Sequence, residues 1–424
     1  MTDTVIDEIV TAAGVQLAVR PQPLGAFALP LGFMLIPDGD DTEAARLALL
    51  AGRVPEAWPP RLTAHRHALA GDRAAALASL DGQDPVTRYN RFVLNSDLED
   101  ADELRSVLGE FAPLVDVVSF ALGLVDSPPE GGTCDREIAA VVLGAQASHA
   151  MAADPAAAVA MLDEAVEAAR GVSPALAGVL VGASASILVQ TGDPGEAHER
   201  LERALRLLGD ADGLCVERAE LHLTAGGLLH EQAQENPGLL AMAVPHYHSA
   251  LQLIRREDAP QLWASAHADL ATAYLTMPMV EASGQLRLGV AAQSLRSALT
   301  VYTREEHPEQ WASVQLNLAN SLVYTPSKHQ ADNLVEAVEL YEAVLEARDR
   351  GTDPLGRARV LANQGNALAH LGAFTEARAK LYEARSLFEE LGDDDSVRAV
   401  RGVLDEVARQ ITLNRNASPA ETAR

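Results

Sequence analysis

Four asparagines form two pairs with the same internal spacing and are the residues best suited to binding chemistry. Asn317 and Asn320 lie in one apolar segment, and Asn363 and Asn366 occupy the equivalent places 46 residues later. Asparagine has a poor helix propensity, so four of them inside helix-like segments require an explanation. A side-chain amide both donates and accepts, and can therefore bind the N–H and C=O groups of an extended peptide. The alternative explanation is that these amides bridge neighbouring helices.

Histidines are concentrated in one part of the chain but are poorly spaced for a metal site. Zinc ligands on a helix need an i, i+4 pair or convergent helices, whereas His65 and His67 are two residues apart. We therefore expect no bound metal. His246 and His248 are also only two residues apart. They belong to a cluster within 222–267 that holds five of the 12 histidines: His222, His230, His246, His248 and His267.

Motifs of enzymes and cofactor-binding proteins are missing from the sequence. It contains no GxxxxGK[ST], no GxGxxG after a predicted strand, no HExxH and no GxSxG. Cys134 and Cys215 are the only cysteines, which excludes a disulfide framework and a thiolate zinc site. We expect a protein that is not an enzyme and that uses no cofactor.

The charge balance indicates the kind of partner. The 424 residues include 33 Lys and Arg against 60 Asp and Glu, a formal charge of −27. Binding to nucleic acids and to anionic membranes depends on basic residues, and the chain has no basic run. The expected partner is a basic or neutral protein or peptide, with no nucleic acid and no membrane. The oligomeric state is left open.

The N-terminal sequence and the apolar runs favour a cytoplasmic protein. The start, MTDTVIDEIV, is acidic and lacks the basic region of a signal peptide. The longest apolar run, 24–36, is broken by Pro30 and is shorter than the ~20 residues that cross a bilayer. Only two lysines occur against 31 arginines, which we interpret as the base composition of a GC-rich bacterial genome.

Composition and internal repeats predict an all-α chain built from helix-turn-helix units. Alanine accounts for 76 residues and aromatics for only 4%, which favours helices over strands. Residues 260–278 and 308–326 are identical at seven of 19 positions, including Trp263 and Trp311. Related segments begin near 217 and 357, and each is followed by a second run with helical periodicity.

Helix starts are marked by Asp-Pro pairs. Aspartate caps the free N–H groups at a helix start, and proline is tolerated at the first helical position. Pro278 and Pro326 are expected to end first helices. The predicted caps are Asp84, Asp154, Asp193 and Asp353.

The repeat pattern resembles the tetratricopeptide repeat (TPR) family. The best unit contains the segment 361–368, then Gly372, Ala377, Leu381 and Ala384, which follow the TPR order of large and small residues. A second good unit covers 184–204, and degenerate ones cover 139–170 and 58–80. The resemblance spans 137–410 well and 42–125 weakly, and it implies a right-handed TPR-like α-solenoid. Units starting near 217, 260 and 308 have longer central turns and resemble the arrays attached to bacterial CHAT-domain proteins; the likeness concerns the array alone.

The resemblance also implies a binding site and a function. In TPR proteins the positions of the paired asparagines face a concave groove that binds a partner segment, so we expect a protein-interaction scaffold or adaptor. A client-specific assembly factor for a larger enzyme and a peptide-sensing regulator are the alternatives. A carboxylate clamp is not expected, because Leu316 and Ala362 occupy its cationic positions. The predicted groove residues are Asn317, Asn320, Tyr324, Arg359, Asn363, Asn366 and His370.

The predicted organisation has four parts. Residues 1–41 form a short irregular or β N-terminal arm, in which 14–37 make a hairpin or extend over the first helices. Residues 42–126 form degenerate helical repeats, and SPPEGG at 127–132 is a linker. Residues 137–410 form the TPR-like array with its capping helix, and 411–424 form a frayed tail.

Overall fold

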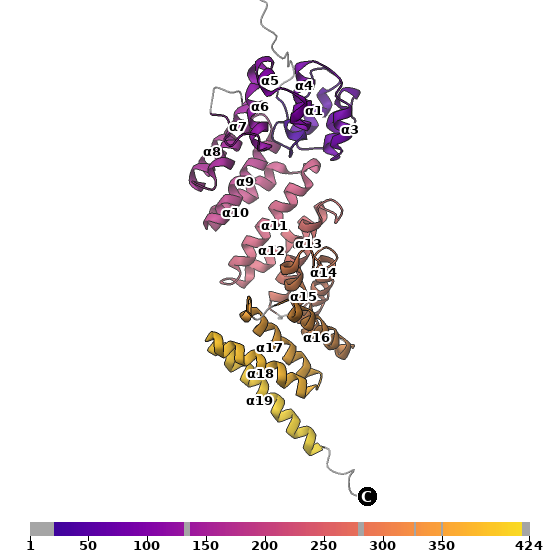
Figure 1. Ribbon diagram of the computed structural model, residues 1–424, viewed down its shortest axis with the longest axis vertical. Coiled ribbons are helices and arrows are strands. Elements are labelled where there is room, and N and C mark those ends of the chain that lie inside the picture. The colour runs from indigo at the N-terminus through magenta and orange to yellow at the C-terminus, as the bar shows by residue number, and fades with distance from the viewer. Residues whose placement is uncertain (1–20, 131–135, 279–283, 326–327, 349–350, 418–424) are drawn as a thin grey trace, which may run out of the picture. The chain divides into compact units, whose positions relative to one another are not determined.

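The computed structural model describes residues 21–130, 136–278, 284–325, 328–348 and 351–417 (Figure 1). These residues form 19 α-helices and six short 3₁₀ helices and contain no strand. Contacts divide the chain into two compact units, Met1–Leu228 and Leu229–Arg424, here named unit 1 and unit 2. The predicted all-α, TPR-like fold class is confirmed, whereas the finer domain boundaries remain predictions.

Unit 1 is built from consecutive helices that pack on their sequence neighbours. Helix α7 packs on α8, α8 on α9, and α9 on α10. The helices are α1 (Glu43–Leu50), α2 (Thr63–Leu69), α3 (Arg73–Ala78), α4 (Pro85–Leu94), α5 (Ala101–Val107), α6 (Ala112–Ala121), α7 (Arg136–Ala150), α8 (Pro155–Ala169), α9 (Pro174–Thr191), α10 (Pro194–Leu208) and α11 (Cys215–Gln232), which crosses the division.

Unit 2 repeats one arrangement of paired helices. Each helix packs on the next, and first helices of successive pairs also touch, α13 on α15, α15 on α17 and α17 on α19. The helices are α12 (Leu240–Leu253), α13 (Pro260–Thr276), α14 (Gly284–Ala298), α15 (Pro308–Tyr324), α16 (Gln330–Ala347), α17 (Pro354–His370), α18 (Phe374–Leu391) and α19 (Asp394–Ala417). This layout brings a row of first helices side by side.

The predicted Asp-Pro caps are confirmed at all four sites. The side chains of Asp84, Asp154, Asp193 and Asp353 each accept the N–H of the residue three positions later, at 3.0, 3.0, 3.2 and 2.8 Å. Each following proline begins its helix. An Asp-Pro pair therefore predicts the start of a helix at these four positions. Pro278 follows the end of α13, and Pro326 lies outside the described residues.

Small residues set the close spacing of each helix pair. Ala377, Leu381 and Ala384 of α18 are at most 1% exposed. Gly365 of α17 faces them, and a Cβ there would stand 2.6 Å from Leu381 Cγ, too close for a carbon contact. The TPR pattern of small and large residues is thus the pattern of contacts between α17 and α18.

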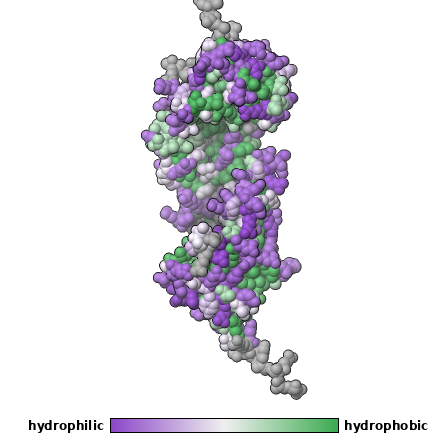
Figure 2. Space-filling view, viewed as in Figure 1, coloured by the Kyte–Doolittle hydropathy of each residue, from purple (hydrophilic) through white to green (hydrophobic). Residues whose placement is uncertain are grey.

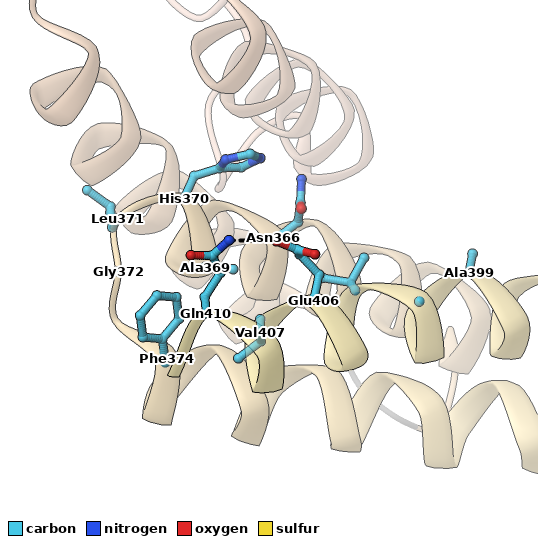
Figure 3. A pocket seen from close by; sticks show the side chains of 12 residues that line it. Asn366, Ala369, His370, Leu371, Gly372, Phe374, Ala399, Glu406, Val407 and Gln410 are labelled. Atoms are coloured by element: carbon cyan, nitrogen blue, oxygen red, sulfur yellow. Dashed lines mark hydrogen bonds between the residues drawn. The ribbon is translucent and has the colours of Figure 1, made fainter. Parts of the chain in front are cut away.

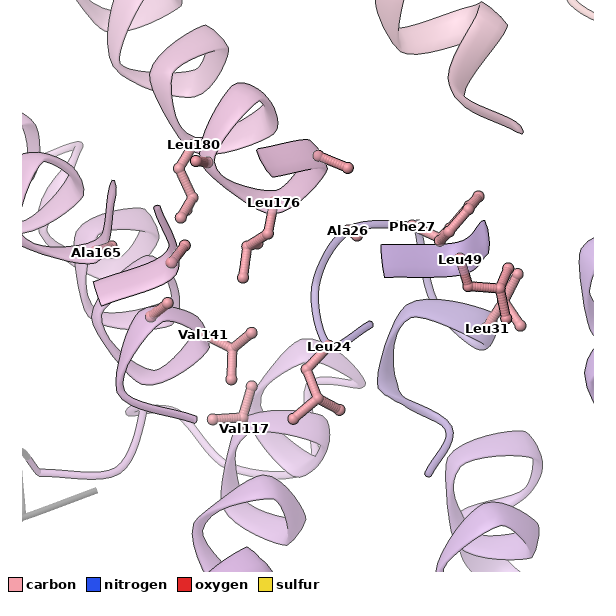
Figure 4. Packing of buried hydrophobic residues seen from close by; sticks show 14 of the residues in the cluster. Leu24, Ala26, Phe27, Leu31, Leu49, Val117, Val141, Ala165, Leu176 and Leu180 are labelled. Atoms are coloured by element: carbon pink, nitrogen blue, oxygen red, sulfur yellow. The ribbon is translucent and has the colours of Figure 1, made fainter. Parts of the chain in front are cut away.

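The N-terminal segment forms part of the core of unit 1, and of the two predicted forms, irregular or β, the described residues 21–37 adopt the irregular one. These residues form turns and the 3₁₀ helix Leu31–Phe33. Gln22 bonds both the N–H and the C=O of Ile36, and Asn90 of α4 does the same for Leu35. In Figure 4, side chains of this segment face the neighbouring helices; the labelled residues are Leu24, Ala26, Phe27, Leu31, Leu49, Val117, Val141, Ala165, Leu176 and Leu180.

Contacts between distant parts of the sequence also fix the loop after α1. Ser173 Oγ donates to the carbonyl of Leu50 at 2.9 Å. The N–H of Val54 donates to Asp212 at 2.8 Å, and the N–H of Gly213 donates to Gly52 O at 3.0 Å. The loop after α1 is therefore joined to residues that lie more than 100 positions later in the chain.

Two helices depart from sequence expectations. Helix α9 is long and apolar enough to cross a membrane, which the count of apolar runs overlooked because small and hydroxyl residues interrupt it. It lies between α8 and α10, with 56% of the segment buried, as expected for a core helix. Helix α19 continues to Ala417, past the predicted end at 410, because Ile411 extends the apolar face of Leu404 and Val407.

The acidic charge is concentrated in unit 1. That unit has 34 Asp and Glu against 15 Lys and Arg, whereas unit 2 has 26 against 18. Hydrophilic residues cover much of the visible surface, and hydrophobic ones form smaller patches (Figure 2). Unit 2, which holds the predicted groove residues, is therefore the less acidic of the two units.

Candidate functional site

Four predicted groove residues line one pocket of about 620 Å³ in unit 2. The pocket, here named the asparagine pocket, lies among α13, α14, α15 and α17. Successive first helices contact one another, so equivalent positions on them face the same space. The lining residues are Thr272, Leu275, Thr276, Leu288, Asn317, Asn320, Ser321, Tyr324 and Asn363.

The asparagines also bridge neighbouring helices. Asn320 Oδ1 on α15 accepts the hydroxyl of Tyr341 at 2.7 Å and Asn363 Nδ2 on α17 at 3.0 Å. Asn317 Nδ2 donates to Thr272 Oγ1 on α13 at 3.5 Å. Burial raises the pKa of Tyr341, which keeps its hydroxyl protonated as a donor. The bridging of neighbouring helices, offered as the alternative explanation, is therefore confirmed, whereas peptide binding by these amides stays a prediction.

The asparagine pocket presents polar groups without formal charge. Three amides, the hydroxyls of two threonines, one serine and one tyrosine, and two leucine side chains form its lining. Tyr324 is 65% exposed at the end of α15. Such a surface suits uncharged donors and acceptors, and the peptide backbone is the commonest ligand of that kind.

Asn366 and His370 line a second pocket, of about 640 Å³, here named the α19 pocket. Asn363 and Asn366 are three residues apart on α17, on one face of the helix. Helix α17 therefore contributes to both pockets. The asparagine pocket lies on its α15 side, and the α19 pocket lies on its α19 side. The lining residues, most of them labelled in Figure 3, are Asn366, Ala369, His370, Leu371, Gly372, Phe374, Ala399, Gly402, Val403, Glu406, Val407 and Gln410.

Arg359, the remaining predicted groove residue, lines neither pocket. It lies near Asp393, whose pKa is lowered mainly by hydrogen bonds from Ser396 and further by the charge of Arg359. Arg357 donates to the backbone carbonyls of Leu345 and Arg348 instead. Neither arginine adds a cation to the asparagine pocket, so both stand outside the geometry of a carboxylate clamp.

A half-buried aspartate in unit 2 was missed by the sequence analysis. Asp269 of α13 accepts a hydrogen bond from Ser265 at 3.4 Å, and burial raises the pKa of Asp269 to about 6. The only sequence signal was an acid inside the apolar first helix of a repeat. Nearby, His248 Nε2 lies 2.9 Å from the hydroxyl of Tyr274, so this histidine has a local partner.

The histidine-rich region holds no metal-ligand group. Among the described residues, no three or more His, Cys, Asp or Glu side chains lie close enough together to hold a metal ion. His267 instead packs its ring edge-on against Trp263, with centroids 4.3 Å apart. His230 Nδ1 lies 3.4 Å from the hydroxyl of Tyr247.

Comparisons with known proteins return structures alone. No family model matches the chain, and no curated protein matches it. The apo form of RapI matches with 13% identity and a TM-score of 0.42, over 64% of this chain and 98% of RapI. The TPR domain of P58(IPK) matches with 16% identity and a TM-score of 0.27, over 84% and 98%. A human IFIT1 dimer with PPP-AAAA matches with 12% identity and a TM-score of 0.37, over 89% and 97%.

These TM-scores are low, so the fold is assigned from the helix pairs and from the small residues at their contacts. Paired antiparallel helices, a row of adjacent first helices, and alanine and glycine at the pair contacts define the architecture. The fold of the described residues is a TPR-like array of helix pairs.

Proposed function

We propose that unit 2 is a protein-interaction module that binds an extended segment of a partner across the asparagine pocket. The observation that carries the proposal is the convergence of Asn317, Asn320, Tyr324 and Asn363 on one uncharged pocket. Asparagine amides there pair with backbone N–H and C=O groups, and the leucines contact the partner's side chains. Recognition is therefore by hydrogen bonds to the main chain.

The same proposal covers the broader role of the protein. It acts as a cytoplasmic scaffold or adaptor, without enzyme activity or cofactor, toward a neutral or basic protein. The acidic surface of unit 1 disfavours nucleic acids and anionic membranes and accelerates encounter with basic partners. A client-specific assembly factor and a peptide-sensing regulator are narrower versions of this role, since both begin with the same binding step.

The test uses Asn363→Ala on a partner recovered from the native host by pull-down and mass spectrometry. Asn363 is preferred to Asn320, because removing Asn320 also leaves the buried Tyr341 hydroxyl without its acceptor. Loss of one or two hydrogen bonds at about 1 kcal/mol each predicts a 5- to 30-fold faster dissociation. Surface plasmon resonance measures this rate.

A matched control separates binding from folding. Asn333→Ala makes the same substitution on α16, outside both pockets. It should leave the dissociation rate within twofold of the wild type. A dissociation rate unchanged by Asn363→Ala would show that the partner binds elsewhere.

A further inference from the structure

The α19 pocket differs chemically from the asparagine pocket. One carboxylate, Glu406, lines it together with the amides of Asn366 and Gln410. The apolar part of the lining comes from Phe374 and Val403, among others. Figure 3 shows the amide, imidazole and carboxylate groups gathered between α17 and α19, with Phe374 at one edge. A pocket with an acid at one side and an aromatic ring at another suits a long cationic side chain.

We propose that the α19 pocket binds an arginine side chain of the partner segment. The proposal rests on the groove function above and adds a specificity element to it. The methylene stem lies against Phe374 and Val403, and the guanidinium reaches Glu406. Arginine is favoured over lysine because its planar group has five N–H donors and can bond the carboxylate and the amide oxygens of Asn366 and Gln410 together.

Glu406 has capacity for one more donor. Its Oε2 accepts Arg409 Nε at 2.9 Å, and its Oε1 accepts Arg409 Nη2 at 2.8 Å and Gln410 Nε2 at 2.8 Å. A carboxylate offers about four acceptor positions, so one position on Oε2 remains. The hydrogen bonds from Arg409 and Gln410 lower the pKa of Glu406, which is therefore ionised at neutral pH.

Arg409 is an internal competitor for the ligand arginine. It lies three residues from Glu406 on α19, its side chain is 65% exposed, and it does not line the pocket. An exposed pair of this kind is weak, so a guanidinium held in the pocket can share the carboxylate or displace Arg409. Removing Arg409 therefore favours the ligand, whereas removing the charge of Glu406 opposes it.

The spacing of the two pockets predicts a sequence rule for the partner. Neighbouring helix axes are about 8–10 Å apart, and an extended chain advances about 3.3 Å per residue. A segment that crosses α17 therefore places an uncharged residue in the asparagine pocket and an arginine about three positions away in the α19 pocket. This spacing distinguishes the expected motif from a basic run.

The experiment begins with a phage-displayed library of random 12-residue peptides, selected on the full chain. We expect a consensus that contains an arginine about three positions from an uncharged residue. A consensus peptide is then synthesised with arginine or with citrulline, its neutral isostere, and both are titrated by calorimetry. Citrulline should weaken binding to the wild type about tenfold.

Two opposite variants test the role of Glu406 directly. Glu406→Gln should weaken the arginine peptide about tenfold and leave the citrulline peptide unchanged, whereas Arg409→Ala should tighten the arginine peptide about threefold. Asp405→Asn, an exposed neighbour that lines neither pocket, makes the same change of net charge and should alter affinity by less than twofold. A merely structural role for the Glu406–Arg409 pair would make both of its variants act in the same direction.

The outcomes separate this inference from the groove proposal. Peptides selected without arginine, but lost on Asn363→Ala, overturn the arginine pocket and leave the groove proposal standing. Arginine and citrulline peptides of equal affinity overturn it as well. A library that yields no binding peptide overturns both.

Discussion

Replacing Asn320 with alanine should destabilise the helices around the asparagine pocket more than it alters the pocket's surface. Tyr341 is 1% exposed, and its hydroxyl donates to Asn320 Oδ1 at 2.7 Å. A buried hydroxyl without its acceptor costs about 1–3 kcal/mol, and the lost bond from Asn363 adds roughly 0.5–1 kcal/mol. We therefore expect Asn320→Ala to lower the local free energy of opening by about 2–3 kcal/mol.

A second substitution isolates the hydrogen bond. Tyr341→Phe removes the donor together with its need for an acceptor, so Asn320→Ala should cost only about 1 kcal/mol in that background. The expected coupling between Asn320 and Tyr341 is about 1–2 kcal/mol. Equal costs of Asn320→Ala in the two backgrounds would refute this assignment of the hydrogen bond.

The assay must report on α15–α17 alone. Repeat arrays open in parts, so a single melting temperature of the full chain mixes several transitions. Hydrogen exchange of peptides from these helices, measured by mass spectrometry under native conditions, gives the local free energy of opening. Asn333→Ala on α16 is the control, because it removes an asparagine that does not bond Asn320 or Tyr341. It should change the local free energy of opening by less than about 0.5 kcal/mol at ~25 °C.

Two further predictions concern the core of unit 2. Gly365→Ala should destabilise the α17–α18 pair by about 1 kcal/mol, because overpacking at the 2.6 Å approach outweighs the gain in helix propensity. The matched control is Gly289→Ala, where an added Cβ meets no atom within 4 Å, and it should stabilise α14 by up to about 1 kcal/mol. Hydrogen exchange measures the local free energy of opening for both variants. A change of the same sign in both would contradict the packing described for Gly365. Asp269 has its pKa raised to about 6, so its stabilising contribution is present below pH 4 and is lost as pH rises through 6. Asp269→Asn should therefore stabilise α13 by about 1–3 kcal/mol at pH 7 and leave its stability unchanged at pH 4. Hydrogen exchange at the two pH values, corrected for the intrinsic exchange rate, checks this difference.

Local signals made the helices and their pairing predictable. Each Asp-Pro pair marks a helix start through contacts within three residues, as at Asp353, and the small residues of a TPR unit record the contact of one helix with the next, as at Gly365. Asn320 of α15 bonds Asn363 of α17, 43 positions later, because the repeat packs successive first helices against each other. The regular repeat spacing therefore predicts which helices are neighbours in the fold.

Features that depend on non-repeated contacts were not predictable. Arg359 shares the helical periodicity of Asn363 and Asn366, yet it lies near Asp393 because α19 begins beside it. The partial burial of Asp269 depends on packing around α13 that its own helix does not encode. The sequence left the N-terminal segment open between an irregular and a β form, because one of its hydrogen-bond partners, Asn90, lies 55 residues away.

The closure of unit 1 has a consequence for how the chain folds during synthesis. The bond between Val54 and Asp212 joins residues 158 positions apart, and Gln22 bonds Glu137 over 115 positions. At roughly 5–20 residues per second, the ribosome needs on the order of ten seconds or more between the two ends of the longer contact. During that interval the apolar residues 24–36 leave the exit tunnel without their later partners. Unit 2 needs only adjacent repeats, so its pairs can fold as they emerge, whereas the core of unit 1 stays incomplete until its later helices have been made.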